Sequence, residues 1–442
     1  MAEVKVLKRD GRKVDYDESK IRLALTNAFL DVDGEITDDS LEKINSITSS
    51  ITKIGKNTSV EEIQNLIETK LMSTNRKDVA KSYILYREER ARERDKRSNF
   101  RKLLKEKLSA SNVQNQNANI DEHSFGGRIG EANDVLLKQL ALDEYVSEMA
   151  RNNHLNNEVY IHDLNSYVVG MHNCLSIPFD KLLANGFNTR QTDVRPANSI
   201  NTAFQLVAVI FQLQSLQEFG GCSATHLDWT MIPYVRKSFY KHYNEVSDTL
   251  LLGKTLNLTK EEVVELSIDS ELYKGKHWWN FVKRRTYKKA MKRTITELDQ
   301  AVEGMYHNLN TLQSRSGNQL PFTSINYGSC TLTEGRMVIK ALLEGSIRGV
   351  GKFHKTSIFP CGIFQVGEGI NKHKGDPNYD LYRLALKSTA QRLYPNYANL
   401  DWSVNKGYDK NDPKTYVATM GLGTSPFQTN RTLLKGCELI AC

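Results

Sequence analysis

Helix-like and strand-like segments alternate along the chain from about residue 130 onward. Most of the helical segments are amphipathic, whereas the one at 203–219 is apolar nearly all round, which is typical of a buried helix. Helices that alternate with short apolar strands indicate an α/β domain and argue against a helical bundle or a β-sandwich. The expected helices are 136–152, 203–219 and 294–312, and the expected strands are 159–162, 320–327 and 357–366.

The first 95 residues follow a different pattern. A strand candidate at 4–7 runs into a turn at Asp10 and Gly11, and Asp17 is a suitable start for a helix. Three further helical patterns follow, so we expect a small β-hairpin followed by about four helices. These patterns cover residues 40–54, 60–72 and 78–90.

The net charge of +8 comes from two segments. Residues 86–107 hold 10 basic and 5 acidic residues, with Arg and Glu interleaved, and are expected to form a solvated linker helix with internal ion pairs. Residues 274–293 hold nine basic residues and no acidic one. The rest of the chain is net acidic, which does not fit a uniformly basic nucleic-acid binder.

The second basic segment has two interpretations. Trp278, Trp279, Phe281 and Tyr287 are interleaved with its Lys and Arg residues, a combination that can line a path for single-stranded nucleic acid. A charged face on the helix that follows, or a surface insertion before it, explains the same residues and is favoured. No nucleic-acid partner is therefore expected.

The cysteine pattern and the hydropathy exclude several classes of protein. None of the six cysteines forms a Cys-x-x-Cys pair, so we expect buried free thiols and no metal site within this chain. No apolar stretch approaches the roughly 20 residues of a membrane-spanning helix, and the N-terminus lacks the features of a signal peptide. We therefore expect a cytoplasmic protein without a membrane partner. The cysteines are residues 174, 222, 330, 361, 437 and 442.

Basic residues surround the turn near the N-terminus. Lys8 and Arg9 precede Asp10 and Gly11, and Lys20 lies on the helix that follows. Cations near a glycine turn and a helix N-terminus can hold a triphosphate, although an isolated basic turn is more often a solvated hairpin.

The two ends of this segment are VLKRDGRKVDYDESKI at 6–21 and DVAKSYILYREER at 78–90. They resemble the ends of an ATP-cone, the regulatory module found in many ribonucleotide reductases, and the resemblance covers residues 4–95. It implies that the segment binds ATP or dATP as allosteric effectors. Lys8, Arg9 and Lys20 would occupy basic positions of the nucleotide pocket, and Asp10 and Gly11 would form its turn.

Short motifs also occur in order through the rest of the chain. They are YIHDL at 160–164, MHNC at 171–174, PANSI at 196–200, GNQLPF at 317–322, FP at 359–360 and GDPNYD at 375–380. Together they resemble successive signatures of the anaerobic, class III ribonucleoside-triphosphate reductases, and several motifs in one order discriminate better than one. The resemblance runs from about residue 130 to Gly421. It implies the N-terminal part of a ten-stranded α/β barrel of the glycyl-radical and ribonucleotide reductase type.

This resemblance implies a radical oxidoreductase that converts ribonucleoside triphosphates to deoxyribonucleoside triphosphates. In the family, a stored glycyl radical makes one cysteine a thiyl radical, which removes the 3′ hydrogen of the ribose. A second cysteine on the other face of the sugar assists loss of the 2′ hydroxyl, and it maps onto Cys174. A thiol suits both tasks because sulfur supports one-electron and two-electron oxidation. Without the flanking motifs, Cys174 would be expected to be a buried thiol, as Cys361 is.

The resemblance also implies partners and further groups. Family members are homodimers, need a radical-SAM activating protein, and use formate or a thioredoxin-like protein as the reductant. The glycyl radical and a four-cysteine structural zinc site lie in the C-terminal part of family members, beyond the resemblance seen in this chain.

The resemblance stops inside a motif. The family places its radical cysteine in a Met-Gly-Cys-Arg motif, but here Met420 and Gly421 are followed by Leu422. A hydrocarbon side chain cannot replace a thiol in this cycle, so we expect this chain alone to be inactive. The tail, with Cys437 and Cys442, has no counterpart in the family, which suggests an interrupted reading frame. Sequencing beyond codon 442 would test that hypothesis.

The expected organisation is an ATP-cone at 1–95, a charged helical linker at 96–129, the first part of the barrel at 130–421 and an unmatched tail at 422–442. Two other functions remain open. The chain could be a nucleotide-sensing regulatory fragment that binds ATP and dATP. Alternatively, its basic aromatic segment could make it a single-stranded nucleic-acid-binding protein.

Overall fold

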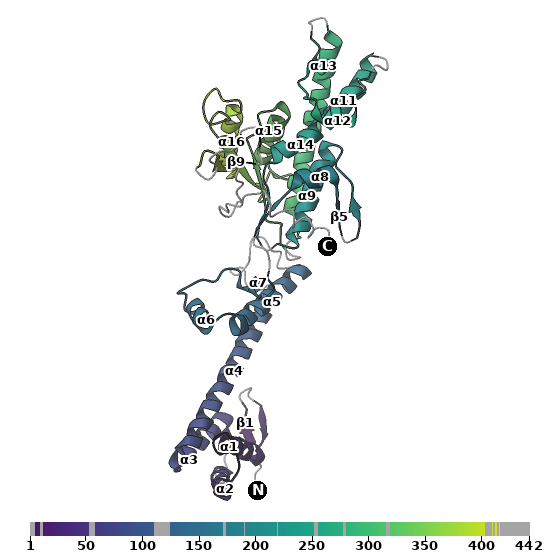
Figure 1. Cartoon of the computed structure of the whole chain (residues 1–442). Coiled ribbons are helices and arrows are strands. Elements are labelled where there is room, and N and C mark those ends of the chain that lie inside the picture. The colour runs from purple at the N-terminus through teal and green to yellow at the C-terminus, as the bar shows by residue number, and fades with distance from the viewer. Residues whose placement is uncertain are drawn as a thin grey trace. The chain divides into compact units, whose positions relative to one another are not determined.

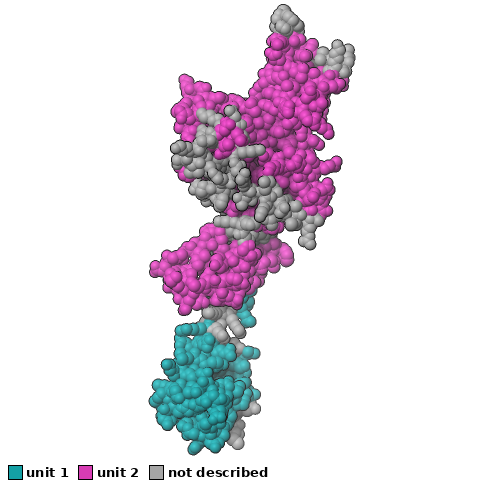
Figure 2. Space-filling view, viewed as in Figure 1, with its two compact units in different colours: residues 1–105 teal, residues 106–442 magenta. Residues whose placement is uncertain are grey.

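The chain forms two compact units, residues 1–105 and residues 106–442, which Figure 2 shows in different colours. The fold is that of a computed structural model. It describes residues 5–8, 12–52, 58–109, 124–170, 174–189, 191–218, 220–251, 255–276, 280–314 and 319–402, together with 409, 412 and 415.

The first unit combines a small sheet with four helices. The sheet has the order β2-β1-β3, in which β1 is antiparallel to β2 and parallel to β3. Its strands are β1 (Lys5–Leu7), β2 (Lys13–Asp15) and β3 (Thr58–Ser59). The helices are α1 (Glu18–Asp33), α2 (Asp38–Thr52), α3 (Val60–Ser73) and α4 (Lys77–Ser109).

Local sequence explains where these helices begin. The Asp17 carboxylate accepts the backbone N–H of Ser19 at the start of α1, and Ser59 forms a capping box with Glu62 at the start of α3. The buried faces of the helices meet in one apolar core, which includes Leu25, Phe29, Ile44, Leu71 and Val79.

The predicted hairpin and four helices are confirmed, with two additions. Strand β3 has only two residues, so no periodicity could reveal it. The helical patterns predicted at 78–90 and 86–107 form one continuous helix, α4, of 33 residues. Residues 112–122, which are rich in Asn and Gln and are expected from the sequence to form an irregular connection, lie outside the described part of the chain.

The second unit begins with a group of helices that the sequence predicted only in part. They are α5 (Phe125–Leu140), the π-helix η2 (Ala141–Tyr145), α6 (Glu148–Leu155) and α7 (Leu164–Tyr167). The single helix predicted over 136–152 is wrong, because the chain becomes extended at Val146 and Ser147 then caps a new helix.

The strand predicted at 159–162 is also wrong. The backbone N–H of Ile161 donates to Nδ1 of His154 at 3.1 Å, and Val159 and Tyr160 are exposed. The β-branched and aromatic residues gave a local strand signal, but β propensity depends on packing against neighbouring strands. These residues belong to none of the described sheets.

A parallel sheet of five strands organises the rest of the unit (Figure 1). Its order is β10-β9-β8-β7-β4, and every neighbouring pair is parallel. The strands are β4 (Leu175–Ile177), β7 (Cys222–Ala224), β8 (Thr323–Tyr327), β9 (Cys361–Val366) and β10 (Asn396–Asn399).

Helices connect successive strands of this sheet, as parallel pairing requires. The long helices are α9 (Ile200–Ser215), α11 (Ile232–Leu251), α14 (Phe281–Thr311), α15 (Thr333–Arg348) and α16 (Tyr379–Arg392). The shorter elements are α8 (Phe179–Asn185), β5 (Phe187–Asn188), β6 (Asp193–Val194), α10 (Leu227–Thr230), α12 (Lys260–Glu265) and α13 (Glu271–Lys274).

The predicted α/β class is confirmed: a mostly helical first unit precedes an α/β unit with a parallel sheet. The described sheet has five strands, against the ten that the resemblance implies for a complete barrel. Helix α9 is largely buried, as predicted, but ends at Ser215. Helix α14 begins at Phe281, well before the predicted start at residue 294, and so includes much of the second basic segment.

The largest apolar core lies between this sheet and its helices. Cys222, Ala224, Ile325, Tyr327 and Phe364 point from the strands into that core, where residues of α9, α14, α15 and α16 meet them. Of the helices in the described part of the chain, none is both long enough and apolar enough to cross a membrane.

Candidate functional site

The face of the parallel sheet opposite the apolar core carries polar side chains. Ser176 on β4 is paired with Ser223 on β7, Ser223 with Ser324 on β8, and Ser324 with Cys361 on β9. Residues paired across parallel strands share a face, and side chains alternate along each strand. We use the term polar face for Ser176, Ser223, Ser324, Asn326 and Gln365. On β9, Ile363 is paired with Asn326 and lies on the same face, and Cys361 packs with the apolar core.

Cys174 lies at the edge of this polar face. It directly precedes β4, and the N–H of the next residue, Leu175, donates to the carbonyl of Gly221 at 3.0 Å. Side chains alternate between the two faces of a strand, so Cys174, two residues before Ser176, lies on the same face as Ser176. Its side chain is exposed, whereas Cys222, Cys330 and Cys361 are buried. The thiol of Cys174 is therefore accessible, and it is not the buried thiol that would be expected without the flanking motifs.

Gln365 is the most unusual residue of the polar face. Its side chain is completely buried, and neither Oε1 nor Nε2 has a hydrogen-bond partner among the described residues. Asn326 on the adjacent strand is different, because its amide donates to Oγ of Ser223 at 3.1 Å and to the carbonyl of Ala224 at 3.0 Å. A buried amide without partners costs about 1–3 kcal/mol, and such groups often mark a place for a ligand or water.

Hydrogen bonds fix the loop that follows β8, at the carboxyl end of the sheet. The buried carboxylate of Asp228 accepts the N–H groups of Gly328 at 2.9 Å and Cys330 at 3.0 Å. Burial raises the pKa of Asp228 to about 6. Asn378, from the GDPNYD motif, donates to the carbonyls of both loop residues. This asparagine is buried, and its contacts in the structure hold the loop in place.

Gly328 is required by this arrangement. Its φ is +119°, and a Cβ on this residue would lie 3.1 Å from the carbonyl oxygen of Gln365. Both the backbone conformation and the close approach favour glycine. The loop therefore holds the strand that carries Gln365 in close contact with β8.

Cys361 has the structural role predicted for it. Its side chain is buried, its Sγ lies 3.5 Å from the hydroxyl of Tyr394, and burial raises the pKa of the thiol. A buried protonated thiol is a weak nucleophile. The prediction of a buried thiol at Cys361 is confirmed.

The predicted nucleotide-binding residues of the first unit are only partly described. The N–H of Lys8 donates to the carbonyl of Arg12 at 2.8 Å, which closes the β1–β2 hairpin. Lys20 lies in the first turn of α1, where its ammonium group is 3.2 Å from Asp17 and its side chain is 75% exposed. Arg9, Asp10 and Gly11 lie outside the described residues.

Three other predicted features also fall outside the described residues. These are Leu422, which the resemblance aligns with the family's radical cysteine, and the tail residues Cys437 and Cys442. Within the part of the chain that the structure does describe, no three His, Cys, Asp or Glu side chains come close enough to hold a metal ion.

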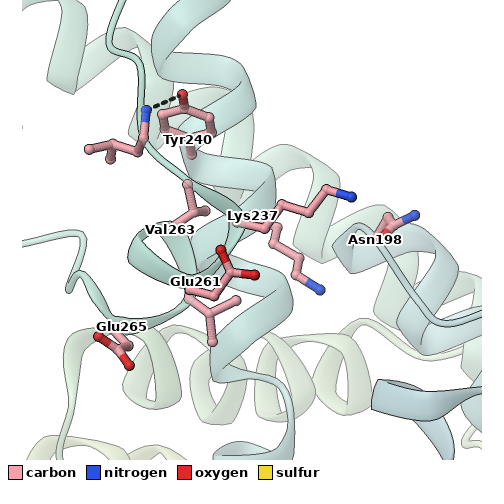
Figure 3. A pocket seen from close by; sticks show the side chains of 9 residues that line it. Asn198, Lys237, Tyr240, Glu261, Val263 and Glu265 are labelled. Atoms are coloured by element: carbon pink, nitrogen blue, oxygen red, sulfur yellow. Dashed lines mark hydrogen bonds between the residues drawn. The ribbon is translucent and has the colours of Figure 1, made fainter.

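A separate cavity of about 520 Å³ lies where α11, α12 and the segment before α9 meet (Figure 3). Two of its lysines, Lys237 and Lys260, are near each other, and burial together with this like charge lowers the pKa of Lys237. Their ammonium groups suit a phosphate-bearing ligand. The sequence analysis did not predict this cavity. It is lined by Asn198, Lys237, Tyr240, Leu258, Lys260, Glu261, Val263, Val264 and Glu265.

The polar face was not predicted from the sequence, although β8 contains a signal for it. The strand reads Thr-Ser-Ile-Asn-Tyr, so apolar Ile325 and Tyr327 alternate with polar Ser324 and Asn326. Parallel strands covered by helices on both faces are usually apolar throughout. Alternation in a fully buried parallel strand therefore indicates that one face has a polar function.

Comparison with known proteins gives consistent matches along the chain. The family model for anaerobic ribonucleoside-triphosphate reductase matches residues 116–432, and the model for the ATP cone domain matches residues 4–92. The anaerobic ribonucleoside-triphosphate reductase of Haemophilus influenzae is 29% identical over 410 residues, which cover 91% of this chain and 53% of the relative. The Escherichia coli K12 enzyme is 29% identical over 400 residues, with coverages of 90% and 51%.

Among solved structures, the chain aligns with the anaerobic ribonucleotide reductase of Thermotoga maritima in complex with dATP and CTP. The sequence identity is 13%, the TM-score is 0.40, and the alignment covers 63% of this chain and 43% of the other. The chain thus spans about half the length of the curated relatives that it matches. Because the reductase family model matches well over half of the sequence, the chain belongs to the anaerobic ribonucleoside-triphosphate reductase family.

Proposed function

We propose that this chain is the N-terminal portion of an enzyme that reduces ribonucleoside triphosphates to deoxyribonucleoside triphosphates. The observation that carries the proposal is the exposed thiol of Cys174 at the edge of a polar face, in a chain of this reductase family. A thiol here can donate a proton to the ribose 2′ hydroxyl, which leaves as water, while the reducing electrons come from the formate or thioredoxin-like reductant of the family. The polar side chains beside it can hold the hydroxyl groups of the sugar.

In the family, a glycyl radical supplies the thiyl radical that removes the 3′ hydrogen. The described residues do not fit the zinc site that accompanies that radical, because they contain no cluster of metal ligands. Leu422 occupies the position of the thiyl cysteine in the sequence. We therefore assign to this chain the substrate-facing Cys174 but not the initiating radical.

The first unit would sense the balance of ATP and dATP. Lys8 lies in the β1–β2 turn, and Lys20 lies on the first turn of α1, the helix that follows the hairpin. Lys20 forms an ion pair with Asp17 on the surface of the protein, and such exposed pairs contribute little to stability. A triphosphate could therefore recruit Lys20 at low cost, together with Lys8, Arg9 and the turn at Asp10 and Gly11.

The remaining components follow from family membership as further parts of this proposal. They are a homodimer, a radical-SAM activating protein, and formate or a thioredoxin-like protein as the reductant. A cytoplasmic location fits these partners.

The first prediction concerns effector binding. Lys8→Ala combined with Lys20→Ala should weaken ATP and dATP binding about tenfold or more, because two charge-assisted contacts are lost. Isothermal titration calorimetry on the whole chain measures both dissociation constants. Lys81→Ala, which removes an exposed lysine from α4 in the same unit, is the matched control and should bind normally. Unchanged affinity in the double variant would rule out this site.

The second prediction concerns Gln365. Gln365→Leu should raise the free energy of unfolding by about 1–3 kcal/mol, because it removes a buried amide that has no hydrogen-bond partner among the described residues. The same variant should weaken binding of a ribonucleoside triphosphate. Asn326→Leu is the control, since its amide is hydrogen-bonded and its loss should destabilise the fold. Urea unfolding measures both variants, and destabilisation of Gln365→Leu to the same extent would contradict this account.

The third prediction concerns turnover. The purified chain, supplied with a radical-SAM activating protein, formate and ribonucleoside triphosphates, should form no deoxyribonucleotide, because Leu422 cannot form a thiyl radical. Chromatography of radiolabelled nucleotides provides the measurement. If a deoxyribonucleotide accumulates with this chain as the only reductase present, the assignment of Leu422 is wrong. Binding of ATP and dATP without any binding of substrate would instead favour the regulatory fragment.

A further inference from the structure

Helix α14 presents a strongly basic face to solvent. Its buried residues include Thr286, Ala290 and Thr294, which lie on one side of the helix. Five exposed cations lie on the opposite side. Consecutive ones are one or three residues apart, and alternate ones are four apart, so all five lie within about half of the helix circumference. We use the term basic ridge for Arg284, Arg285, Lys288, Lys289 and Lys292.

None of the five cations has a carboxylate partner among the described residues. The salt bridges near this helix use other residues: Lys274 pairs with Asp269, and Lys276 with Glu271. Arg293, at the far end of the ridge, pairs with Glu245 on α11, which lies beside α14 (Figure 1). The basic ridge is therefore not ion-paired within the described part of the chain.

Helix α4 shows how this chain builds an ordinary solvated helix. Arg and Glu are interleaved there, and Arg92 pairs with Glu88 one turn earlier at 2.7 Å. On α14, by contrast, like charges follow each other at four-residue spacing, from Arg284 to Lys288 to Lys292, and such pairs destabilise a helix. This repulsion lowers the stability of α14, and binding of a polyanion would reduce it.

We infer that the basic ridge binds the phosphate backbone of single-stranded nucleic acid. Rows of cations about 6 Å apart along the helix can contact successive phosphates. Phe281 lies on the first turn of α14, before the ridge, and its side chain is 69% exposed. An exposed ring beside a basic track is the combination that stacks bases of a single strand. This inference does not depend on the reductase function.

The proposal revises the expectation drawn from the sequence. A charged helix face accounts for the basic residues, but not for the absence of acidic partners among the described residues or for the exposed Phe281. An acidic protein would satisfy the charges without using the aromatic ring. Single-stranded nucleic acid uses both features.

Fluorescence anisotropy with the whole chain tests this inference. The probe is a labelled oligothymidylate of roughly 20 nucleotides, longer than the sites of about 4–16 nucleotides that such surfaces cover. With about four phosphate contacts, affinity should fall about 50-fold between 50 and 200 mM NaCl. Absence of binding at the lower salt concentration, or salt-independent binding, would overturn the proposal.

Two triple variants separate the ridge from net charge. Arg284→Glu with Lys288→Glu and Lys292→Glu should weaken binding about tenfold or more. The control has the same change in net charge but alters exposed lysines elsewhere, and its affinity should remain close to that of the parent chain. Equal losses in both variants would mean that the ridge has no specific role. The control changes are Lys181→Glu, Lys352→Glu and Lys387→Glu.

Phe281→Ala and a polyglutamate competitor identify the class of partner. The substitution should weaken oligothymidylate binding at least about fivefold, because a stacking contact is lost. Polyglutamate with the same number of charges should compete poorly. An unchanged affinity for Phe281→Ala together with effective competition would overturn the nucleic-acid proposal in favour of an acidic protein. Unfolding midpoints close to that of the parent chain show that the variants are folded.

Discussion

The register of the five-stranded parallel sheet is the constraint on which the second unit depends. Strands β4, β7 and β8 pair so that Ile177, Ala224 and Ile325 share one face and Ser176, Ser223 and Ser324 the other, and β9 adds Phe364 to the first face and Gln365 to the second. A slip of one residue would exchange the two faces of a strand. It would move Tyr327 and Phe364 out of the core, and burial of each large apolar side chain contributes about 1.5–3 kcal/mol. The core therefore fixes the position of the polar face.

The polar face in turn determines which side chains surround Cys174. A thiol at a random surface position has few fixed neighbours, but this one lies at the edge of a sheet whose polar side chains are held in register. The loop after β8, tied by Asp228 and Asn378, keeps β8 and β9 together at the other end. Gln365 is buried beside that loop, and its amide has no hydrogen-bond partner among the described residues, which suits a group that meets a ligand.

The sequence predicted those elements that depend on a local residue pattern. The helices of the first unit, the strands at 323–327 and 361–366, and the family followed from periodicity and ordered motifs. It failed where tertiary contacts decide. The strand expected at 159–162 has no neighbour, and the helix expected over 136–152 breaks at Ser147. Exposure of Cys174 and the unpaired amide of Gln365 depend on packing between distant segments, which no local pattern encodes.

The ion pairs of the charged helices were also only partly predictable from the sequence. Counting Lys and Arg located both basic segments, but only the structure separates them. In α4, Arg92 is ion-paired with Glu88, whereas the cations of the basic ridge face solvent without carboxylate partners among the described residues. The pair of Glu88 and Arg92, four residues apart on one helix, could be predicted from the sequence. The pair of Glu245 and Arg293 could not, because it joins residues that are far apart in the chain.

The central claim is that ribonucleotide substrate binds on the polar face, beside Cys174. The most direct measurement is the rate at which N-ethylmaleimide alkylates Cys174, followed by peptide mass spectrometry with and without CTP. A chain with both Lys8→Ala and Lys20→Ala is used as well, so that binding to the first unit cannot contribute. The account predicts that Cys174 reacts faster than the three buried cysteines, at 222, 330 and 361, and that saturating CTP slows it several-fold. An alkylation rate that CTP does not change would contradict it.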